Sequence, residues 1–176
     1  MSTTCSTLAV VKLSEGVEWG LHCVVLLARM PREATARRVE LAEYHGLPES
    51  YLAKHLHALT RATVLHAVSG PKGGYRLGRA PRDITVLDVV EAIEGSSQPF
   101  VCQEIRQRGT GALAPDQCRR PCLINSVMSQ ADRAWRDTLR AVTIADLVSQ
   151  LPASIPNLVS PAGSARRTTS EPGQNQ

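Results

Sequence analysis

The fold is decided by residues 48–79, PESYLAKHLHALTRATVLHAVSGPKGGYRLGR, in which a helical pattern gives way to a hairpin pattern. In the first half, Leu52, Leu56 and Leu59 recur at helical spacing and predict a helix with one buried face. In the second half, alternating apolar residues flank a turn rich in glycine, which predicts a β-hairpin. The segment therefore predicts a helix followed directly by two short strands.

The preceding segment supplies a partner helix. Residues 35–46, TARRVELAEYHG, have the pattern of a short helix with Thr35 as its N-cap and Gly46 at its end. Leu47 and Pro48 then make a tight turn into the next helix. Two short helices joined by a tight turn and followed by a hairpin predict a winged helix-turn-helix, whose second helix enters the major groove of DNA.

The polar positions of this unit predict which side chains contact DNA. Outward residues of the second helix face the base edges, and basic residues of the hairpin reach the phosphates. The alternative is a phosphate-binding loop at GPKGG, but this stretch lacks Walker A spacing and no helix follows it. The predicted contacts are Ser50, Tyr51, Lys54 and His55 in the groove and Lys72 and Arg76 on the backbone.

Composition and charge agree with a DNA-binding protein. The chain of 176 residues is 43% hydrophobic and only 3% aromatic, which favours packed helices with an aliphatic core. Its net charge is +4, but residues 29–82 hold ten Lys or Arg against four Asp or Glu, an excess of six positive charges that suits double-stranded DNA. No apolar run reaches the length of a membrane span and no secretory signal is present, so we expect a cytoplasmic protein without a membrane partner.

A helix predicted from Ser14 to Met30 contains an unusual polar pair within VEWGLHC, residues 17–23. Glu18 and His22 are one helical turn apart, and their side chains therefore emerge on the same face. Such a pair can bind a ligand together, or it can be an ordinary surface pair. These residues alone leave both interpretations open.

The C-terminal half combines a cysteine-containing loop with a long helix. Thr85 and Asp88 form a capping box for a helix that ends at Gly95, and an irregular stretch with three cysteines follows. Beyond Pro121, apolar residues recur along one side of a helix up to Val142, too many for a domain of this size to bury, which predicts pairing with a second copy of the chain.

The chain is accordingly predicted to be mainly α with a small β-hairpin wing, a winged helix-turn-helix with a long C-terminal dimerisation helix. The predicted parts are a flexible extension over 1–11, a DNA-binding domain over 12–95, a cysteine loop over 96–122, the dimerisation helix and a short terminal helix over 123–151, and a disordered tail over 152–176.

Four stretches together resemble the IscR/NsrR family of bacterial winged-helix regulators, and in particular its redox-sensing members. They are KLSEGVEWGLHCVVLLA, ESYLAKHLHALTRATVL, SGPKGGYRLGR and ITVLDVVEAIEG, and the resemblance extends from about Lys12 to Val148. It implies a homodimer that binds a DNA operator. It also implies an iron–sulfur cluster held by the cysteine loop beside the dimer helix, with a further ligand from the first helix of the other subunit.

The sequence departs from the family pattern at two places. Fifteen residues separate Cys102 from Cys118 and only three separate Cys118 from Cys122, which is less even than the family spacing. Ser69 stands in the wing where the family often has an arginine. If Cys102 is too remote to bind, the four positions of a 2Fe-2S cluster are filled by Cys118, Cys122, Glu18 and His22. Trp19, beside Glu18, is then the predicted switch residue.

Three alternatives remain open at this point. A nitric-oxide-sensing 4Fe-4S regulator would use Cys102 with Cys118 and Cys122 and a fourth ligand from Glu18 or His22. A cluster-free DNA-binding protein would have only structural thiols, or it would bind zinc, which accepts the same Cys and His ligands. A hydrolytic metal site is disfavoured because no second carboxylate lies at a useful spacing, so we expect no enzyme activity.

Overall fold

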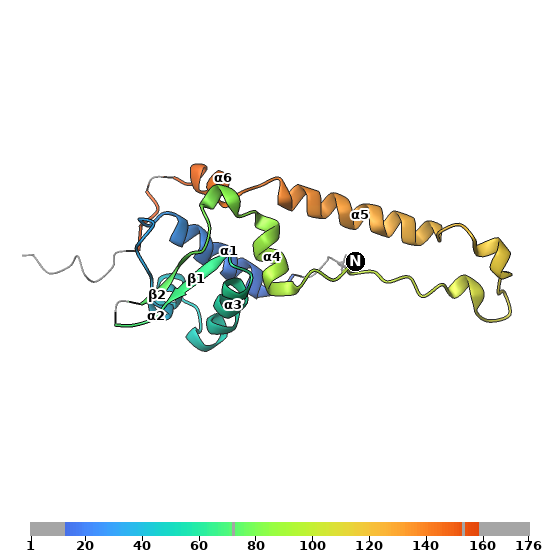
Figure 1. Ribbon diagram of the computed structural model, residues 1–176, viewed down its shortest axis with the longest axis horizontal. Helices are drawn as coiled ribbons and strands as arrows, with labels where there is room; N and C mark the ends of the chain where they lie inside the picture. Colours follow the sequence, from blue (N-terminus) through green and yellow to red (C-terminus); the bar gives the residue numbers. More distant parts are fainter. Residues whose placement is uncertain (1–12, 72, 153, 159–176) are drawn as a thin grey trace, which may run out of the picture.

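A computed structural model describes residues 13–71, 73–152 and 154–158, which form a helical body and an arm that projects from it (Figure 1). The winged helix-turn-helix predicted from the sequence is confirmed. In chain order, the elements are α1 (Glu15–Ala28), α2 (Arg38–His45), α3 (Glu49–Arg61), β1 (Leu65–Val68), β2 (Gly74–Leu77), η1 (Pro81–Asp83), α4 (Val86–Glu94), η2 (Ile105–Gln107), η3 (Pro115–Cys118), α5 (Leu123–Arg140) and α6 (Ile144–Ser149).

The core of the body lies where α1 packs against α3, α4 and α6. Leu52, Leu56 and Leu59 of α3 are fully buried there, as their helical spacing predicts. Val24 of α1 and Val89 of α4 complete the centre of the same cluster. Aliphatic residues thus fill the core, which the low aromatic content requires.

The wing is fastened to the helix-turn-helix by backbone hydrogen bonds. In the antiparallel hairpin, Leu65 pairs with Leu77 and Val68 with Gly74. Ala36 extends the pairing, because its N–H donates to the Tyr75 carbonyl at 3.0 Å and its carbonyl accepts from the Tyr75 N–H at 2.7 Å. The extended backbone at Ala36 explains one correction: the N-cap of α2 is Arg37 and not Thr35.

Capping boxes set the start of two helices that lie next to each other. Thr85 Oγ1 accepts from the Asp88 N–H at 3.1 Å, and the Asp88 carboxylate accepts from the Thr85 N–H at 2.9 Å, as predicted for α4. Thr143 and Asp146 repeat this arrangement at α6. A β-bridge between Thr85 and Thr143 brings the two caps together, so α6 returns to the body after the long α5.

The arm consists of the 96–122 loop and α5, and it has no buried core within one chain. None of residues 95–131, all of which the structure describes, is buried. The base of α5 is held by Arg136, which pairs with Asp132 of α5 at 2.9 Å and with Glu91 of α4. Further out, α5 exposes an apolar stripe that we call the α5 stripe; it consists of Leu123, Ile124, Val127 and Met128.

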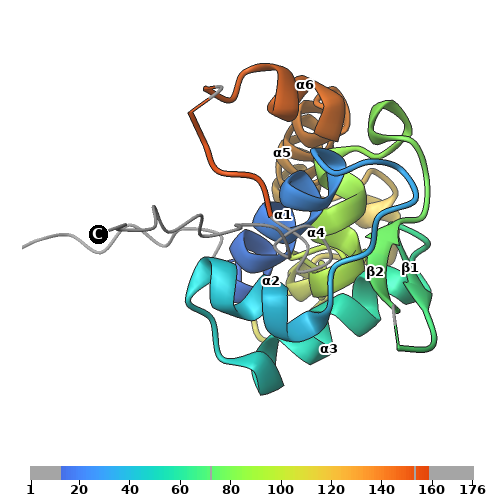
Figure 2. The same ribbon diagram turned by 90° about the vertical axis from the view of Figure 1, so that its left-hand side faces the viewer.

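Residues after α6 return along α1 (Figure 2). Arg29 Nη2 donates to the Ile155 carbonyl at 2.7 Å, and the Tyr44 hydroxyl donates to the Pro156 carbonyl at 2.5 Å. Leu158 packs against the main core. The predicted disordered tail from residue 152 therefore includes a segment that docks on α1 and α2.

The expectations for residues 1–11, Lys72 and 159–176 lie outside the described residues. Within the described ranges, no helix is both long and apolar enough to cross a membrane.

Candidate functional site

The predicted ligands occupy two separate parts of one chain. Glu18 and His22 lie on α1 in the body, whereas Cys102, Cys118 and Cys122 belong to the 96–122 loop. Figure 1 shows this loop and α5 projecting from the body. The structure therefore brings the cysteines near one another but does not bring them to Glu18 and His22 of the same chain.

Two cysteines and a carboxylate converge in the arm. The donor atoms of Cys102, Glu104 and Cys122 all lie within 4.8 Å of one another, although Cys102 and Cys122 are separated by nineteen residues. The Cys102 thiol donates to Glu104 Oε1 at 3.4 Å. This trio can offer two sulfur donors and one oxygen donor to a metal. Cys118, at the end of η3, is half-buried nearby but is not part of the trio.

The loop reaches this shape through Glu104 and Arg106. Glu104 has a left-handed backbone, with φ of 47°, and is the N-cap of η2. Arg106 Nη2 donates to both Glu104 carboxylate oxygens, at 2.9 and 2.7 Å, and to the Arg120 carbonyl at 3.2 Å. One guanidinium thus links the segment after Cys102 to the segment before Cys122.

The two thiols of the trio differ in acidity. The backbone amide of Asn125, in the first turn of α5, lowers the pKa of Cys122, and the amide of Ile124 and the charge of Arg106 act in the same direction. At Cys102, the Glu104 backbone amide favours the thiolate, but burial and the Glu104 carboxylate outweigh it and the pKa is raised. Arg106 in turn lowers the pKa of Glu104. Cys122 is therefore the more readily ionised thiol of the pair.

Glu104 was missed by sequence reasoning. The available signal was a carboxylate two positions after a cysteine, followed by an arginine two positions later, within Cys102 to Arg106. That pattern is common on exposed loops, and only the approach of Cys122 in the folded chain gives it significance.

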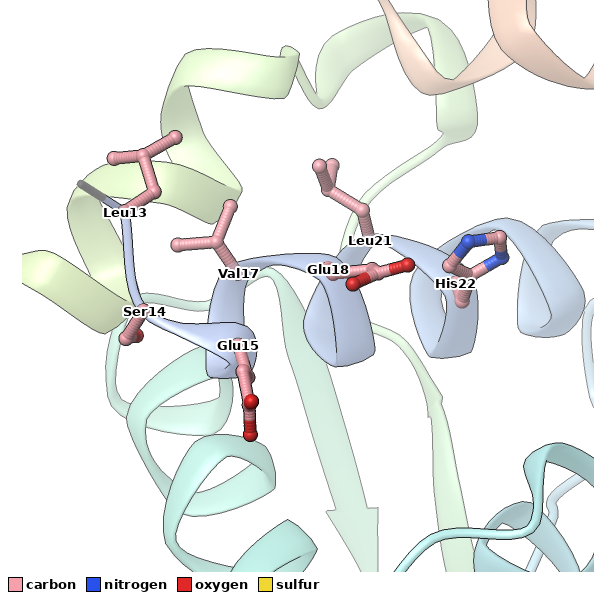
Figure 3. Close-up of a pocket in the computed structure, with 7 residues that line it drawn as sticks. All are labelled: Leu13, Ser14, Glu15, Val17, Glu18, Leu21 and His22. Carbon is pink, nitrogen blue, oxygen red and sulfur yellow. The ribbon is translucent and has the colours of Figure 1, made fainter. Parts of the chain in front are cut away.

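Glu18 and His22 are exposed on one side of α1. They line a shallow hollow of about 430 Å³ together with Leu13, Val17 and Leu21. Figure 3 shows the Glu18 carboxylate pointing along the helix toward the His22 ring. An exposed carboxylate and imidazole beside apolar side chains form a surface that a second chain could cover.

A second hollow of about 230 Å³ continues from the same pair toward the helix-turn-helix and includes Trp19, His45 and Leu47. The rings of His22 and His45 are 5.6 Å apart between centroids. Burial, followed by the nearby His22, lowers the pKa of His45. Trp19 meets the His55 ring of α3 edge to face at 5.9 Å. Trp19 therefore lies between the candidate ligands and the recognition helix.

The predicted DNA-contacting residues are distributed over α3 and the wing. Ser50, Tyr51 and Lys54 are exposed on α3, and Tyr51 is 68% exposed. His55 differs from the prediction, because its ring turns toward α1, where Gly16 leaves space for it. Arg76, on β2, lies 3.8 Å from the Glu33 carboxylate, in a long ion pair whose side chains are both at least partly exposed.

Comparisons with known proteins agree with this geometry. A family model described as Rrf2, iron-dependent transcriptional regulator, matches residues 13–150. The chain is 30% identical over 140 residues to YffB of Lactococcus lactis, which carries the provisional name HTH-type transcriptional regulator, covering 80% of this chain and 88% of that one. The solved structure of T. potens IscR superposes with a TM-score of 0.59 at 26% identity, covering 81% and 93% of the two chains. The solved structure of CymR of B. subtilis, titled a global cysteine regulator, shares the fold, with a TM-score of 0.64 at 24% identity. The match covers 81% of this chain and 100% of the CymR chain.

Proposed function

The chain belongs to the Rrf2 family of DNA-binding transcriptional regulators, and from this premise we propose that it is a homodimer that senses redox state through an iron–sulfur cluster and adjusts its affinity for a palindromic operator. The family model is described as iron-dependent, which supports a metal at the donors identified above. Relatives are named as transcriptional regulators, in agreement with a protein that is not an enzyme.

The observation that carries this proposal is that the two sets of candidate ligands, the cysteines of the arm and the Glu18–His22 pair of α1, lie on separate parts of one chain. The cysteines lie on an arm with no core of its own, and the α5 stripe beside them is exposed. Glu18 and His22 lie in an open hollow on the body. Pairing of two arms would cover the stripe and allow the cysteines of one subunit to meet Glu18 and His22 of the partner subunit.

The donor set suits a 2Fe-2S cluster held by Cys118 and Cys122 of one subunit and by Glu18 and His22 of the partner subunit. The backbone amides of α5 favour the thiolate that Cys122 would provide. Imidazole in place of thiolate is tolerated by such clusters and raises their reduction potential. When bound, the cluster would supply a one-electron change, while Arg106 holds the loop and Trp19 of α1 contacts His55 of α3.

A second candidate is favoured by the trio in the arm. Because the Cys102 donor atom lies within 4.8 Å of that of Cys122, Cys102 can join Cys118 and Cys122 as a third thiolate. That set suits a nitric-oxide-sensing 4Fe-4S regulator, with Glu18 or His22 as the fourth ligand. The same donors also suit zinc in a cluster-free regulator.

Anaerobic purification with iron and acid-labile sulfide assays and a visible spectrum separates these candidates. We expect two irons and two sulfides per site, retained in Cys102→Ala and lost or spectrally altered in His22→Ala, because His22 belongs to the 2Fe-2S ligand set and Cys102 does not. His57→Ala, which removes an exposed histidine of α3, is the matched control. If wild-type protein contains four irons per site and Cys102→Ala contains none, the 4Fe-4S candidate is correct. If wild-type protein binds neither iron nor sulfide, both cluster candidates are overturned.

Trp19→Ala should remove the dependence of operator affinity on redox state, because the Trp19 ring is the described contact between the candidate ligand face and His55 of α3. The measurement is a comparison of operator binding by oxidised and reduced protein at fixed salt. Trp19→Phe retains a ring at this position and should preserve the difference. If Trp19→Ala switches as wild type does, Trp19 does not transmit the signal.

A further inference from the structure

We propose that Cys102 and Cys122 form a reversible intramolecular disulfide when the arm holds no metal, with a hydroperoxide as oxidant. This modification is distinct from redox change at a cluster, because it uses only the thiols of the arm. It therefore stands whether or not the cluster proposal is correct.

The geometry that supports the disulfide is the approach of two cysteines across a long loop. Their sulfur atoms belong to the same group of donors within 4.8 Å, so a small movement is enough to bring them to bonding distance. Both side chains are only partly buried, which leaves a hydroperoxide able to reach them. Arg106 donates to the Glu104 carboxylate and to the Arg120 carbonyl, and so links the segment after Cys102 to the segment before Cys122.

The local contacts assign the sulfur atoms of Cys122 and Cys102 to different steps of disulfide formation. Cys122 lies at the N-terminus of α5, directly before Leu123, and its partly exposed side chain is placed to react first with the hydroperoxide. Cys102 donates to Glu104 Oε1, a contact that keeps its sulfur close to Cys122 within the trio, so it is placed to attack Cys122 in the second step. Cys118 is not in the trio, which makes it the less favoured partner for either sulfur.

The reaction balances in two steps. The Cys122 thiolate attacks one oxygen of the hydroperoxide; a sulfur–oxygen bond forms, the oxygen–oxygen bond breaks, and the departing oxygen takes up a proton as water or an alcohol. The Cys102 sulfur then attacks the Cys122 sulfur. The disulfide forms, the sulfur–oxygen bond breaks, and the leaving hydroxide departs as water with the Cys102 proton. In total, two thiols are oxidised and one hydroperoxide is reduced.

The consequence is a closed arm that cannot offer Cys122 to a metal. A protein in this state would regain metal binding only after a thiol reductant reopens the disulfide. The arm would then have two metal-free states. The reduced state can bind metal again directly, whereas the oxidised state must first be reduced.

The test uses the purified full-length chain, stripped of metal with a chelator, treated with hydrogen peroxide and then alkylated. We expect the loss of two alkylatable thiols, a linked peptide pair containing Cys102 and Cys122, and recovery of both thiols with dithiothreitol. Cys23 is an internal reference, because burial raises its pKa to about 12 and should leave it unreactive in the folded protein.

Variants identify the partners. Cys118→Ser removes a cysteine of the arm outside the trio and should still form the linked pair, whereas Cys102→Ser and Cys122→Ser should form none. The proposal is overturned if wild-type protein mainly links Cys118 to either cysteine, if non-reducing gels show the link between two chains, or if peroxide leaves the thiols of the arm unchanged. Iron and sulfide content play no part in these readouts, so a failed cluster assay would not be confused with a failed disulfide.

Discussion

Replacing Ile124 and Val127 together by glutamate is expected to convert the protein to a monomer and to weaken operator binding by about a hundredfold or more, since a palindromic operator is bound tightly only when both half-sites are engaged by one dimer. Ile124 is 62% exposed and Val127 63% exposed in the single chain. In the proposed dimer, both would be buried against another apolar surface, where an unpaired carboxylate is strongly unfavourable.

Sedimentation equilibrium would report the mass in solution, and a mobility shift with a two-half-site DNA would report affinity. Arg133→Glu is the matched control, because Arg133 is exposed and lies about two and a half helical turns beyond Ile124, on the opposite side of α5 from that residue. This control should remain dimeric. A stable dimer carrying both stripe glutamates would show that α5 pairs through a different surface, or not at all.

Leu56→Ala is expected to destabilise the protein by about 2–5 kcal/mol, the usual cost of removing a fully buried leucine side chain. Leu56 has 0% exposure and lies on α3 in the core formed with α1 and α4. Urea unfolding, monitored by helical circular dichroism, should show a lower midpoint. Both proteins must be compared at the same concentration and metal content, because association and ligand binding also shift the midpoint.

Tyr51→Ala provides the comparison for the core variant. Tyr51 lies on the same helix but is 68% exposed, so its removal should change stability by no more than about 0.5 kcal/mol. It should instead reduce operator affinity if the predicted groove contact is correct. Equal midpoints for Leu56→Ala and wild type would contradict the placement of α3 in the core.

The elements that could be predicted from the sequence are those specified by neighbouring residues. The capping box of α4 needs only Thr85 and Asp88, three positions apart, and it is present as predicted. The leucines of α3 and the glycine-rich turn of the wing are equally local signals. Thr35 failed as a helix cap because a distant residue, Tyr75, holds Ala36 in an extended bridge.

The candidate site was predictable only in its residue types. The approach of Cys102 to Cys122 depends on a left-handed Glu104 and on Arg106 reaching the Arg120 carbonyl, contacts between segments that no periodic pattern specifies. His55 is three positions after Leu52 and one before Leu56, at the edge of the buried face of α3. Which way such a residue turns is decided by its neighbour, and here Gly16 of α1 leaves space for the ring.

The absence of buried residues from 95 to 131, a range the structure describes in full, has a consequence for the evolution of such regulators. An insertion, a deletion or an exchanged cysteine in this part of the arm disturbs no side chain of the body core. If the arm holds the sensing ligands as proposed, natural selection can vary the chemistry that is detected while the winged helix-turn-helix keeps its fold. The uneven cysteine gaps of fifteen and three residues are the kind of variation that such a modular arm tolerates.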